Sequence, residues 1–215
     1  MENLKKGLFI TLEGVDGCGK TIASNLLALR LMKQYGDDVV VKTREPGGVD
    51  IAEQIRAVLL NKNNTDMHSK TEALLYGAAR VEHLDKIIIP ALKDGKIVIC
   101  DRFIDSTVAY QAYGRIGKEV PFINDLNKIV CGQYMPDLTF VLDISEEEAH
   151  RRMRLRNEPM DRFDLESDEF RMRVRNGYNK IAEKEPNRVK IINAEGTPEE
   201  TVNMIMEYIN KTLGD

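Results

Sequence analysis

The residues with the clearest chemistry lie near the amino terminus, in the segment from Gly14 to Thr21. This segment matches the pattern G-x-x-x-x-G-K-[ST] at every fixed position. Glycines let successive backbone N–H groups turn inward around a phosphate, and the positive end of a following helix adds to the attraction. In this pattern Lys20 is expected to reach the β- and γ-phosphates of a nucleotide, and the Thr21 hydroxyl to bind Mg²⁺. The predicted phosphate-binding loop consists of Gly14, Val15, Asp16, Gly17, Cys18, Gly19, Lys20 and Thr21.

A phosphate-binding loop indicates nucleotide binding and leaves the reaction open. GTPase switches, mechanical ATPases and small-molecule kinases all use it. The guanine-reading motif N-K-x-D lacks its aspartate at both places where Asn-Lys occurs, which are residues 127–130 and 179–182. The predicted strand at 97–101 runs into an arginine rather than ending in two acids. The GTPase and motor interpretations are therefore weakened.

Further polar clusters follow the ends of other predicted strands, where open α/β sheets bind their ligands. Arginines near a phosphate-binding loop indicate a second anionic group beside the first, and Tyr76 offers a flat face for a base. Taken singly, Tyr76 could be a core residue and the arginines a solvated helix face. Together they favour a kinase that binds two nucleotides. The clusters are Thr43–Gly48, Tyr76 with Arg80, Asp101–Gln111 and an arginine-rich stretch from Arg151 to Arg175.

The order and spacing of these motifs resemble those of bacterial thymidylate kinases. The motif Asp-Arg-[aromatic]-x-x-Ser-x-x-Ala-Tyr-Gln at 101–111 is far more specific than the phosphate-binding loop. The resemblance implies phosphorylation of dTMP to dTDP with ATP and Mg²⁺, a five-stranded core with a mobile lid, and a homodimer. The segments that carry it are Glu13–Thr21, Thr43–Gly48, Leu74–Arg80 and Asp101–Gln111.

The resemblance also implies roles for single residues in binding dTMP. Arg44 and Arg102 would hold its phosphate, and Asp16 would meet its sugar 3′-hydroxyl or the phosphate-binding arginine. Arg80 would bond the thymine edge, and Tyr76 stands where the family generally stacks a phenylalanine on thymine. The rest of the expected substrate site is Ser106, with Thr107, Tyr110 and Gln111 closing over base and deoxyribose and Tyr110 acting as a filter against ribose.

Positive charge at the transferred phosphate is expected from the arginine-rich stretch. Some family members carry a catalytic arginine inside the phosphate-binding loop, but Val15–Cys18 contain none. The chain therefore resembles the subgroup whose lid, here about residues 151–165, supplies this charge. Because the acceptor is already an anionic oxygen, no strong general base is needed. The expected catalytic residues are Lys20, Arg102, Arg154 and Arg156, with Arg151 and Arg162 in reserve, and Asp101 is expected to bind Mg²⁺ through water.

Short apolar runs alternate with segments of helical periodicity and predict how these residues are positioned. Runs at 8–13, 39–43, 97–101, 138–144 and 189–193 suit strands buried on both faces. Ser145–Glu148 and Thr197–Glu200 are capping signals for two of the helices. The pattern predicts an α/β, three-layer phosphate-loop NTPase fold, with a five-stranded parallel sheet and helices on both faces. We expect a single domain over residues 1–215, carrying a mobile charged insert at Arg151–Arg175.

Composition limits the remaining alternatives. The 215 residues include 31 Lys and Arg against 35 Asp and Glu, so the net charge of −4 offers nothing that attracts a nucleic acid polymer. Three scattered cysteines predict a reducing cytoplasmic location, and no apolar stretch is long enough to span a membrane. Two alternatives stay open: a (deoxy)nucleoside monophosphate kinase acting on dUMP or dCMP, and a regulatory protein that hydrolyses ATP slowly.

Overall fold

A five-stranded parallel sheet forms the centre of the computed structural model, which describes residues 7–115, 120–155 and 161–214. The strands lie in the order β2-β3-β1-β4-β5, and every neighbouring pair is parallel. The predicted sheet is confirmed, and each predicted strand lies within one residue of its observed bounds. The strands are β1 (Leu8–Glu13), β2 (Val40–Arg44), β3 (Ile97–Asp101), β4 (Leu138–Asp143) and β5 (Val189–Asn193).

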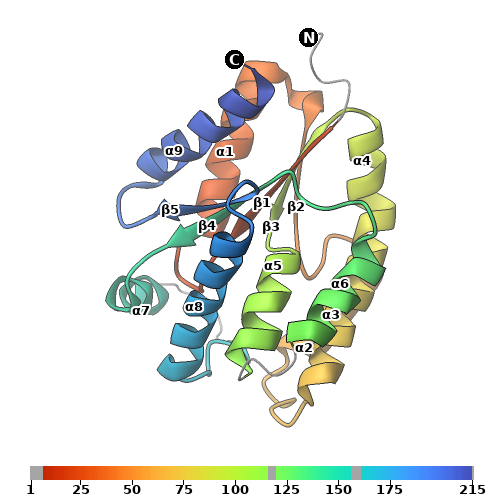
Figure 1. Cartoon of the computed structure of the whole chain (residues 1–215), viewed down its shortest axis with the longest axis vertical. Helices are drawn as coiled ribbons and strands as arrows, with labels where there is room; N and C mark the ends of the chain where they lie inside the picture. Colours follow the sequence, from red (N-terminus) through yellow and green to blue (C-terminus); the bar gives the residue numbers. More distant parts are fainter. Residues whose placement is uncertain (1–6, 116–119, 156–160, 215) are drawn as a thin grey trace.

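Helices cover both faces of the sheet, because side chains along each buried strand point alternately to the two sides (Figure 1). Leu8, Ile10 and Leu12 of β1 pack against α1 (Lys20–Tyr35) and α9 (Pro198–Leu213). Phe9 of β1 points to the other face. There it packs with residues of the helical segments on either side of β3 in the sequence, such as Ile88 before the strand and Ile104 after it. That second face is covered by α4 (Ile89–Lys93), α5 (Ile104–Thr107), α6 (Val120–Cys131) and α8 (Asp168–Lys184).

The remaining helical segments extend from these layers. α2 (Asp50–Leu60) packs against α3 (Ser69–His83) beside the second face. Two π-helical turns continue helices: η2 (Leu84–Ile88) joins α3 to α4, and η3 (Val108–Gly114) extends α5. The other elements are the short 3-10 helix η1 (Asp37–Val39) and α7 (Glu146–Leu155).

The two predicted capping signals have different outcomes. At α9 the Thr197 side chain accepts from the Glu200 N–H, and the Glu200 carboxylate accepts from the Thr197 N–H, so the capping box is complete. At α7 the Ser145 hydroxyl accepts from the Glu148 N–H at 3.3 Å, but the Ser145 N–H donates to Glu195 instead. The second capping box is therefore only half formed.

The arginine-rich stretch is not the single charged insert that its composition predicts. Arg171, Arg173 and Arg175 belong to α8, which is anchored in the core by Phe170, Val174, Tyr178 and Ile181. These buried residues follow helical spacing, and the intervening arginines hide that spacing in a simple count of apolar residues. This part of the prediction was wrong. The catalytic candidate Arg156 lies outside the described residues.

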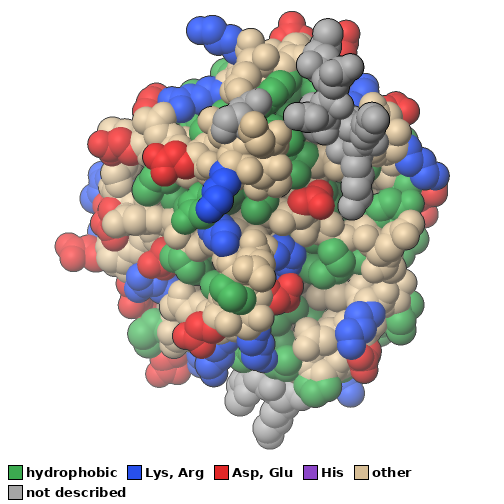
Figure 2. All heavy atoms as spheres, turned by 45° about the horizontal axis from the view of Figure 1, so that its top comes forward, with side chains coloured by type: hydrophobic (Ala, Val, Ile, Leu, Met, Phe, Trp, Pro, Cys, Tyr) green, Lys and Arg blue, Asp and Glu red, His purple; other side chains and the backbone are tan. Residues whose placement is uncertain are grey.

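The face of the molecule shown in Figure 2 carries charges of both signs. In Figure 2 acidic and basic side chains lie side by side, with apolar groups between them. Within the described ranges, none of the helices has the length and apolar character needed to cross a membrane.

Candidate active site

A cavity of about 830 Å³ gathers the predicted site residues at the carboxyl ends of the strands. The phosphate-binding loop after β1, the ends of β2 and β3, and parts of α3, α5, η3 and α7 all contribute to its wall. Gly14, Val15 and Arg154 are the described members of the predicted site that are not part of the lining. The predicted residues that do line it are Asp16, Gly17, Cys18, Gly19, Lys20, Thr21, Arg44, Tyr76, Arg80, Asp101, Arg102, Ser106, Thr107, Tyr110 and Gln111.

The phosphate-binding loop has the backbone shape that its glycines allow. Gly14, Gly17 and Gly19 have φ values of 136°, 83° and 94°, a region that other residues rarely adopt. Helix α1 begins at Lys20, so its positive end faces the loop. The buried Lys20 Nζ donates to the carbonyl oxygens of Gly14 at 3.1 Å and Val15 at 2.9 Å. The loop thus offers backbone N–H groups and an ammonium group to a polyphosphate.

Two oxygen-bearing side chains meet beside this loop. The Thr21 hydroxyl donates to the Asp101 Oδ2 at 3.0 Å, and both residues line the cavity. A hydroxyl and a carboxylate are oxygen ligands of the kind that Mg²⁺ prefers. The pair therefore fits the predicted magnesium site in its donor atoms and its place.

Arg102 lines the cavity and joins its own segment, Asp101–Gln111, to the phosphate-binding loop. Its Nη1 donates to the Gly14 carbonyl oxygen at 2.9 Å, and its Nη2 donates to the Asp16 Oδ1 at 2.6 Å. The Tyr110 hydroxyl donates to the other Asp16 oxygen at 3.0 Å. Burial alone would raise the pKa of Asp16, but the charges of Arg102 and Lys20 and these hydrogen bonds lower it to about 2. Asp16 is therefore ionised at neutral pH.

Arg80 is built into a buried polar network at the wall of the cavity. Its Nε donates to Glu45 at 2.8 Å, Nη1 to Asn127 at 3.1 Å and Nη2 to the Thr107 hydroxyl at 3.0 Å. Gln111, also buried, donates to Glu72. These hydrogen bonds to neighbouring buried residues fix the side-chain orientations of Arg80, Thr107 and Gln111.

Arg44 and Tyr76 also line the cavity, Arg44 with its side chain exposed and Tyr76 half-buried. The exposed Arg44 pairs with Glu53 at 2.8 Å. The ring of Tyr76 lies 6.5 Å from that of Phe163, between ring centroids, and Phe163 also lines the cavity. Burial, followed by the charge of Glu72, raises the pKa of Tyr76 above its usual value, so its hydroxyl stays neutral.

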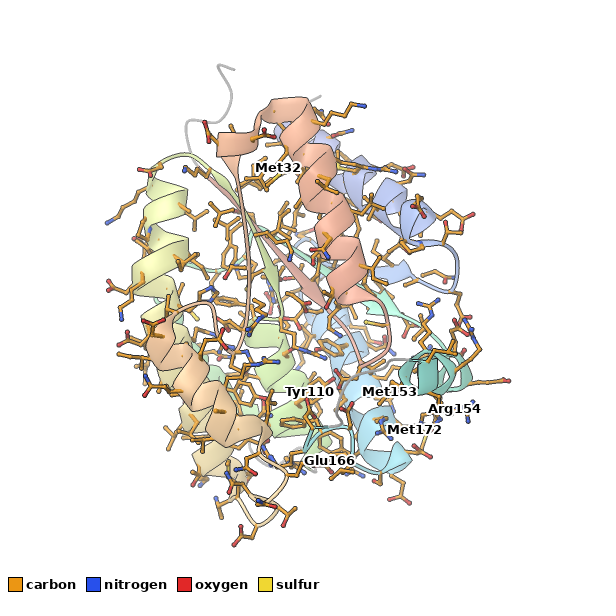
Figure 3. The ribbon with its side chains drawn as sticks, turned by 180° about the vertical axis from the view of Figure 1, so that it is seen from behind. Met32, Tyr110, Met153, Arg154, Glu166 and Met172 are labelled. Carbon is orange, nitrogen blue, oxygen red and sulfur yellow. The ribbon has the colours of Figure 1, made fainter. Side chains whose placement is uncertain are left out.

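The arginines of α7 face different ways. Arg151 and Arg152 line the cavity, and Arg152 donates to the carbonyl oxygen of Cys18 in the phosphate-binding loop at 3.5 Å. Arg154 is exposed, at the periphery of the molecule and well separated from Tyr110 (Figure 3). Arg162, a reserve candidate, is buried 2.6 Å from Glu72 and is not part of the lining.

Several residues of the site were missed from the sequence. Arg56 on α2 and Arg152 on α7 line the cavity; no motif singled out Arg56, and Arg152 was part of the arginine-rich stretch but not one of its candidate residues. Glu13, the last residue of β1, is fully buried beside Arg102. An acidic residue at the end of an otherwise apolar strand is the sequence signal that could have identified Glu13.

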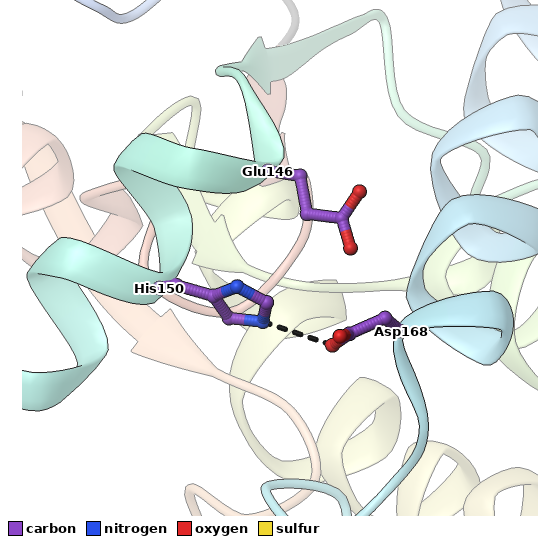
Figure 4. Close-up of side chains that lie close together, drawn as sticks. All are labelled: Glu146, His150 and Asp168. Carbon is purple, nitrogen blue, oxygen red and sulfur yellow. Dashed lines mark ion pairs between the residues drawn. The ribbon is translucent and has the colours of Figure 1, made fainter.

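A separate group of possible metal ligands lies between α7 and α8. Ligand atoms of Glu146, His150 and Asp168 lie within 4.8 Å of one another (Figure 4). His150 Nε2 is 3.0 Å from Asp168 Oδ1, and Asp168 also pairs with Arg171. None of the three residues lines the cavity. The ion pairs account for this group as a link between the two helices.

Comparisons with known proteins agree with this geometry. The family model for thymidylate kinase matches residues 12–205. The thymidylate kinase of Clostridium novyi is 49% identical over 192 residues, which cover 89% of this chain and 92% of that protein. That of Mesoplasma florum is 46% identical, covering 94% and 96%. The crystal structure of thymidylate kinase from Ehrlichia chaffeensis matches with a TM-score of 0.75 and 38% identity, over 95% of this chain and 99% of that one.

A match over most of the chain, together with close relatives of nearly equal length, goes beyond a shared phosphate-binding loop. The chain belongs to the thymidylate kinase family and phosphorylates dTMP to dTDP.

Proposed function

We propose that ATP and dTMP bind end to end in this same cavity, and that ATP supplies the phosphoryl group in line with the dTMP phosphate. The observation that carries this proposal is the position of Arg102. Arg102 belongs to the Asp101–Gln111 segment, and its guanidinium donates to two residues of the phosphate-binding loop, Gly14 and Asp16. A cation at this junction can contact both phosphates that exchange the group.

On the donor side, the loop Gly14–Thr21 would hold the phosphates of ATP. Lys20 would exchange its present carbonyl contacts for phosphate oxygens. Thr21 and Asp101 would hold Mg²⁺, Asp101 through water, as their converging oxygens allow. When bound, Mg²⁺ neutralises phosphate charge and thereby lowers the cost of bringing two polyanions together.

On the acceptor side, Arg44 and Arg102 would bind the dTMP phosphate. Tyr76, with Phe163 beside it, would supply the aromatic surface for thymine. Asp16 and Tyr110 form a hydrogen-bonded pair at 3.0 Å, well placed to meet the sugar. The other residues proposed to contact dTMP are Arg80, Ser106, Thr107 and Gln111, all in the cavity lining.

Catalysis then consists of alignment and neutralisation of charge. The acceptor oxygen is already anionic, so no side chain has to remove a proton from it. We propose Lys20, Arg102, Arg154 and Arg156 as the cations that stabilise the transferred group, with a lid at about 151–165 that excludes water. Arg151 and Arg152 of the same helix already line the cavity, which supports a role for this segment.

A coupled assay of ADP release tests the proposal. The purified full-length chain is incubated with ATP and Mg²⁺, either alone or with dTMP, dUMP or dCMP. We expect ADP release that requires both Mg²⁺ and dTMP. ADP release that is independent of any acceptor would contradict the proposed transfer, because ATP would then be hydrolysed by water.

We also propose that the chain forms a homodimer through α2 and α3. Ile51 and Val58 on α2, and Leu74 and Val81 on α3, are exposed apolar residues spaced seven apart, so each pair lies on one side of its helix. The two helices pack together, and a second copy would cover the combined face.

Light scattering tests the homodimer and should give twice the mass of one chain. Leu74→Asp should lower the measured mass to that of one chain, whereas Leu29→Asp, at an exposed residue of α1, should leave it unchanged. A monomeric wild-type protein would contradict the homodimer.

We further infer that the protein works in the cytoplasm, as a reducing compartment suits its cysteines. Cys18, Cys100 and Cys131 are all free and buried. Fractionation of cells that produce the untagged protein should recover the activity in the cytoplasmic fraction.

A further inference from the structure

Glu13 is a buried carboxylate to which the phosphoryl transfer assigns no task. It is the last residue of β1, and its exposed fraction is 0%. Strand alternation points it to the face shared with Phe9 and Thr11, toward α5 and α8. Among the described residues, no Lys, Arg or His forms an ion pair with it. Burying a carboxylate without an ion pair is costly, so its retention next to the active site calls for a function.

Three neutral donors from two separate parts of the chain satisfy this carboxylate. The Phe103 N–H donates to Oε1 at 2.7 Å. The hydroxyls of Ser106 and Tyr178 donate to Oε2 at 2.5 Å and 3.0 Å. Glu13 thus joins the end of β1 to the turn after β3, to α5 and to α8.

The turn held in this way contains the one unusual backbone conformation among the described non-glycine residues. Arg102 has a φ of 69°, in the left-handed region that side chains other than glycine rarely adopt. Two successive amides fix it to β1: the Arg102 N–H donates to the Leu12 carbonyl at 2.9 Å, and the Phe103 N–H donates to Glu13. A strained conformation persists only where the surroundings hold it in place, and Glu13 provides one of the two bonds.

Glu13 is also linked to the Arg102 side chain. The Arg102 Nη1 donates to the Ser106 hydroxyl oxygen at 3.2 Å, and the Ser106 hydroxyl in turn donates to Glu13. The carboxylate therefore orients Ser106 so that a lone pair faces Arg102. A group at Glu13 that could not accept this proton would leave Ser106 free to turn.

We propose that Glu13 is a positioning residue, which sets the backbone at Arg102 and, through Ser106, the direction of its guanidinium toward the acceptor phosphate. The inference rests on the role proposed above for Arg102 at the dTMP phosphate. Glu13 itself touches neither nucleotide, because it does not line the cavity.

The ionisation of Glu13 supports this role. Burial, and next the charge of Asp105, raises the pKa of Glu13 to about 7. The hydrogen bonds from Ser106 and the Phe103 N–H and the charge of Arg102 act in the opposite direction but do not outweigh this rise. Protonation would turn Oε2 from an acceptor into a donor and break one of its two hydroxyl bonds. The charged and titratable groups that face Glu13 are Arg102, Asp105, Tyr178, Cys100 and Arg80.

The first test compares Glu13→Gln with the wild type. Glutamine keeps the shape and one acceptor for the Phe103 N–H, but its amide nitrogen cannot accept from Ser106 or Tyr178. We expect kcat/KM for dTMP to fall by roughly ten- to a hundredfold, because a misdirected guanidinium loses alignment, while KM for ATP stays unchanged. Glu207→Gln, an exposed residue of α9, is the matched control and should match the wild type.

The second test uses the pH profile, which a merely structural role would not move. The phosphate of dTMP itself titrates at about pH 6. All variants are therefore measured with dTMP as the substrate, so that this titration contributes equally to each profile. In the wild type, kcat/KM should fall at acid pH as Glu13 takes up a proton. Glu13→Gln has no proton to take up at this position, so this part of the fall should be missing. Tyr178→Phe removes a donor to the charged form and should move that fall to higher pH, whereas Tyr208→Phe on α9 should not.

Arg102→Ala, measured in parallel, separates failure of this inference from failure of the proposed site. If Arg102→Ala loses activity but Glu13→Gln keeps the wild-type kcat/KM and pH profile, Glu13 does not position Arg102. If Arg102→Ala itself keeps normal activity, the role proposed for Arg102 fails. If Glu13→Gln does not fold, the pH profile of Tyr178→Phe is the test. A profile of kcat/KM identical to that of the wild type would then overturn the inference.

Discussion

At the scale of single residues, two carboxylates beside Arg102 differ in ionisation because their partners differ. Both are desolvated, which raises the pKa of each. Asp16 meets the charges of Arg102 and Lys20, which lower its pKa to about 2. Glu13 accepts from neutral donors and faces the charge of Asp105, so its pKa lies at about 7. Asp16 in the cavity wall is thus ionised at neutral pH, whereas Glu13 behind the wall titrates near neutrality.

This raised pKa has a consequence for stability. Between pH 4.5 and about 7 the folded protein keeps a proton on Glu13 that the unfolded chain has released, so the free energy of unfolding falls as pH rises. We expect the stability of Glu13→Gln relative to the wild type to increase by up to about 3 kcal/mol from pH 5 to pH 8. Urea denaturation at both pH values measures it. A difference that stays constant with pH would show that Glu13 does not titrate in this range.

Sequence reasoning found the residues whose spacing itself carries the chemistry. The loop Gly14–Thr21 and the segment around Arg102 could be predicted because their backbone requirements are local. Glu13, Arg56 and Arg152 could not, because their roles depend on which way a side chain points after separate elements have packed. Arg154 shows the same limit: it was expected in a mobile charged lid at the transferred phosphate, but it lies on α7 with its side chain exposed and outside the cavity lining.

At the scale of elements, α3 is fixed to the end of β2 by a buried ionic cluster. Glu45 accepts from Arg80 at 2.8 Å and lies 3.0 Å from the His83 ring nitrogen, and all three side chains are almost fully buried. The cluster sets the position of α3, which brings Tyr76 to the cavity wall.

Removing Glu45 should therefore be far more costly than removing an exposed partner. Glu45→Ala leaves the buried Arg80 charge unpaired, and we expect a loss of roughly 3–5 kcal/mol in the free energy of unfolding. Glu53→Ala breaks the exposed pair with Arg44 and should cost less than about 1 kcal/mol. Chemical denaturation of both variants checks this. Equal losses would contradict the assignment of Glu45 as the anchor of α3.

The strands were easier to predict than the helices around the site. Buried parallel strands appear as continuous apolar runs, which the sequence displays directly. α8 was misassigned because arginines separate its buried residues Phe170, Val174, Tyr178 and Ile181. The half-formed capping box at Ser145 reflects competition: Glu148 binds Arg151 and Arg152, and Glu195 takes the Ser145 N–H.

At the scale of the whole molecule, the distribution of charge matters more than its sum. The net charge is −4, yet the cavity is lined by seven Lys and Arg residues against four Asp and Glu residues. This concentration of positive charge attracts small polyanions to one place, while the mixed charges in Figure 2 do not form a continuous basic surface. The fold concentrates this charge because its parallel strands all end near the same cavity.

The most direct test of this account is the activity of Arg102→Ala, measured together with its equilibrium affinity for ATP. The account predicts that phosphorylation of dTMP falls by about 10³-fold or more, while ATP binding is kept. Arg30→Ala, at an arginine of α1 outside the cavity lining, should behave as the wild type. Normal phosphorylation of dTMP by Arg102→Ala would contradict the claim that Arg102 joins the two nucleotide sites.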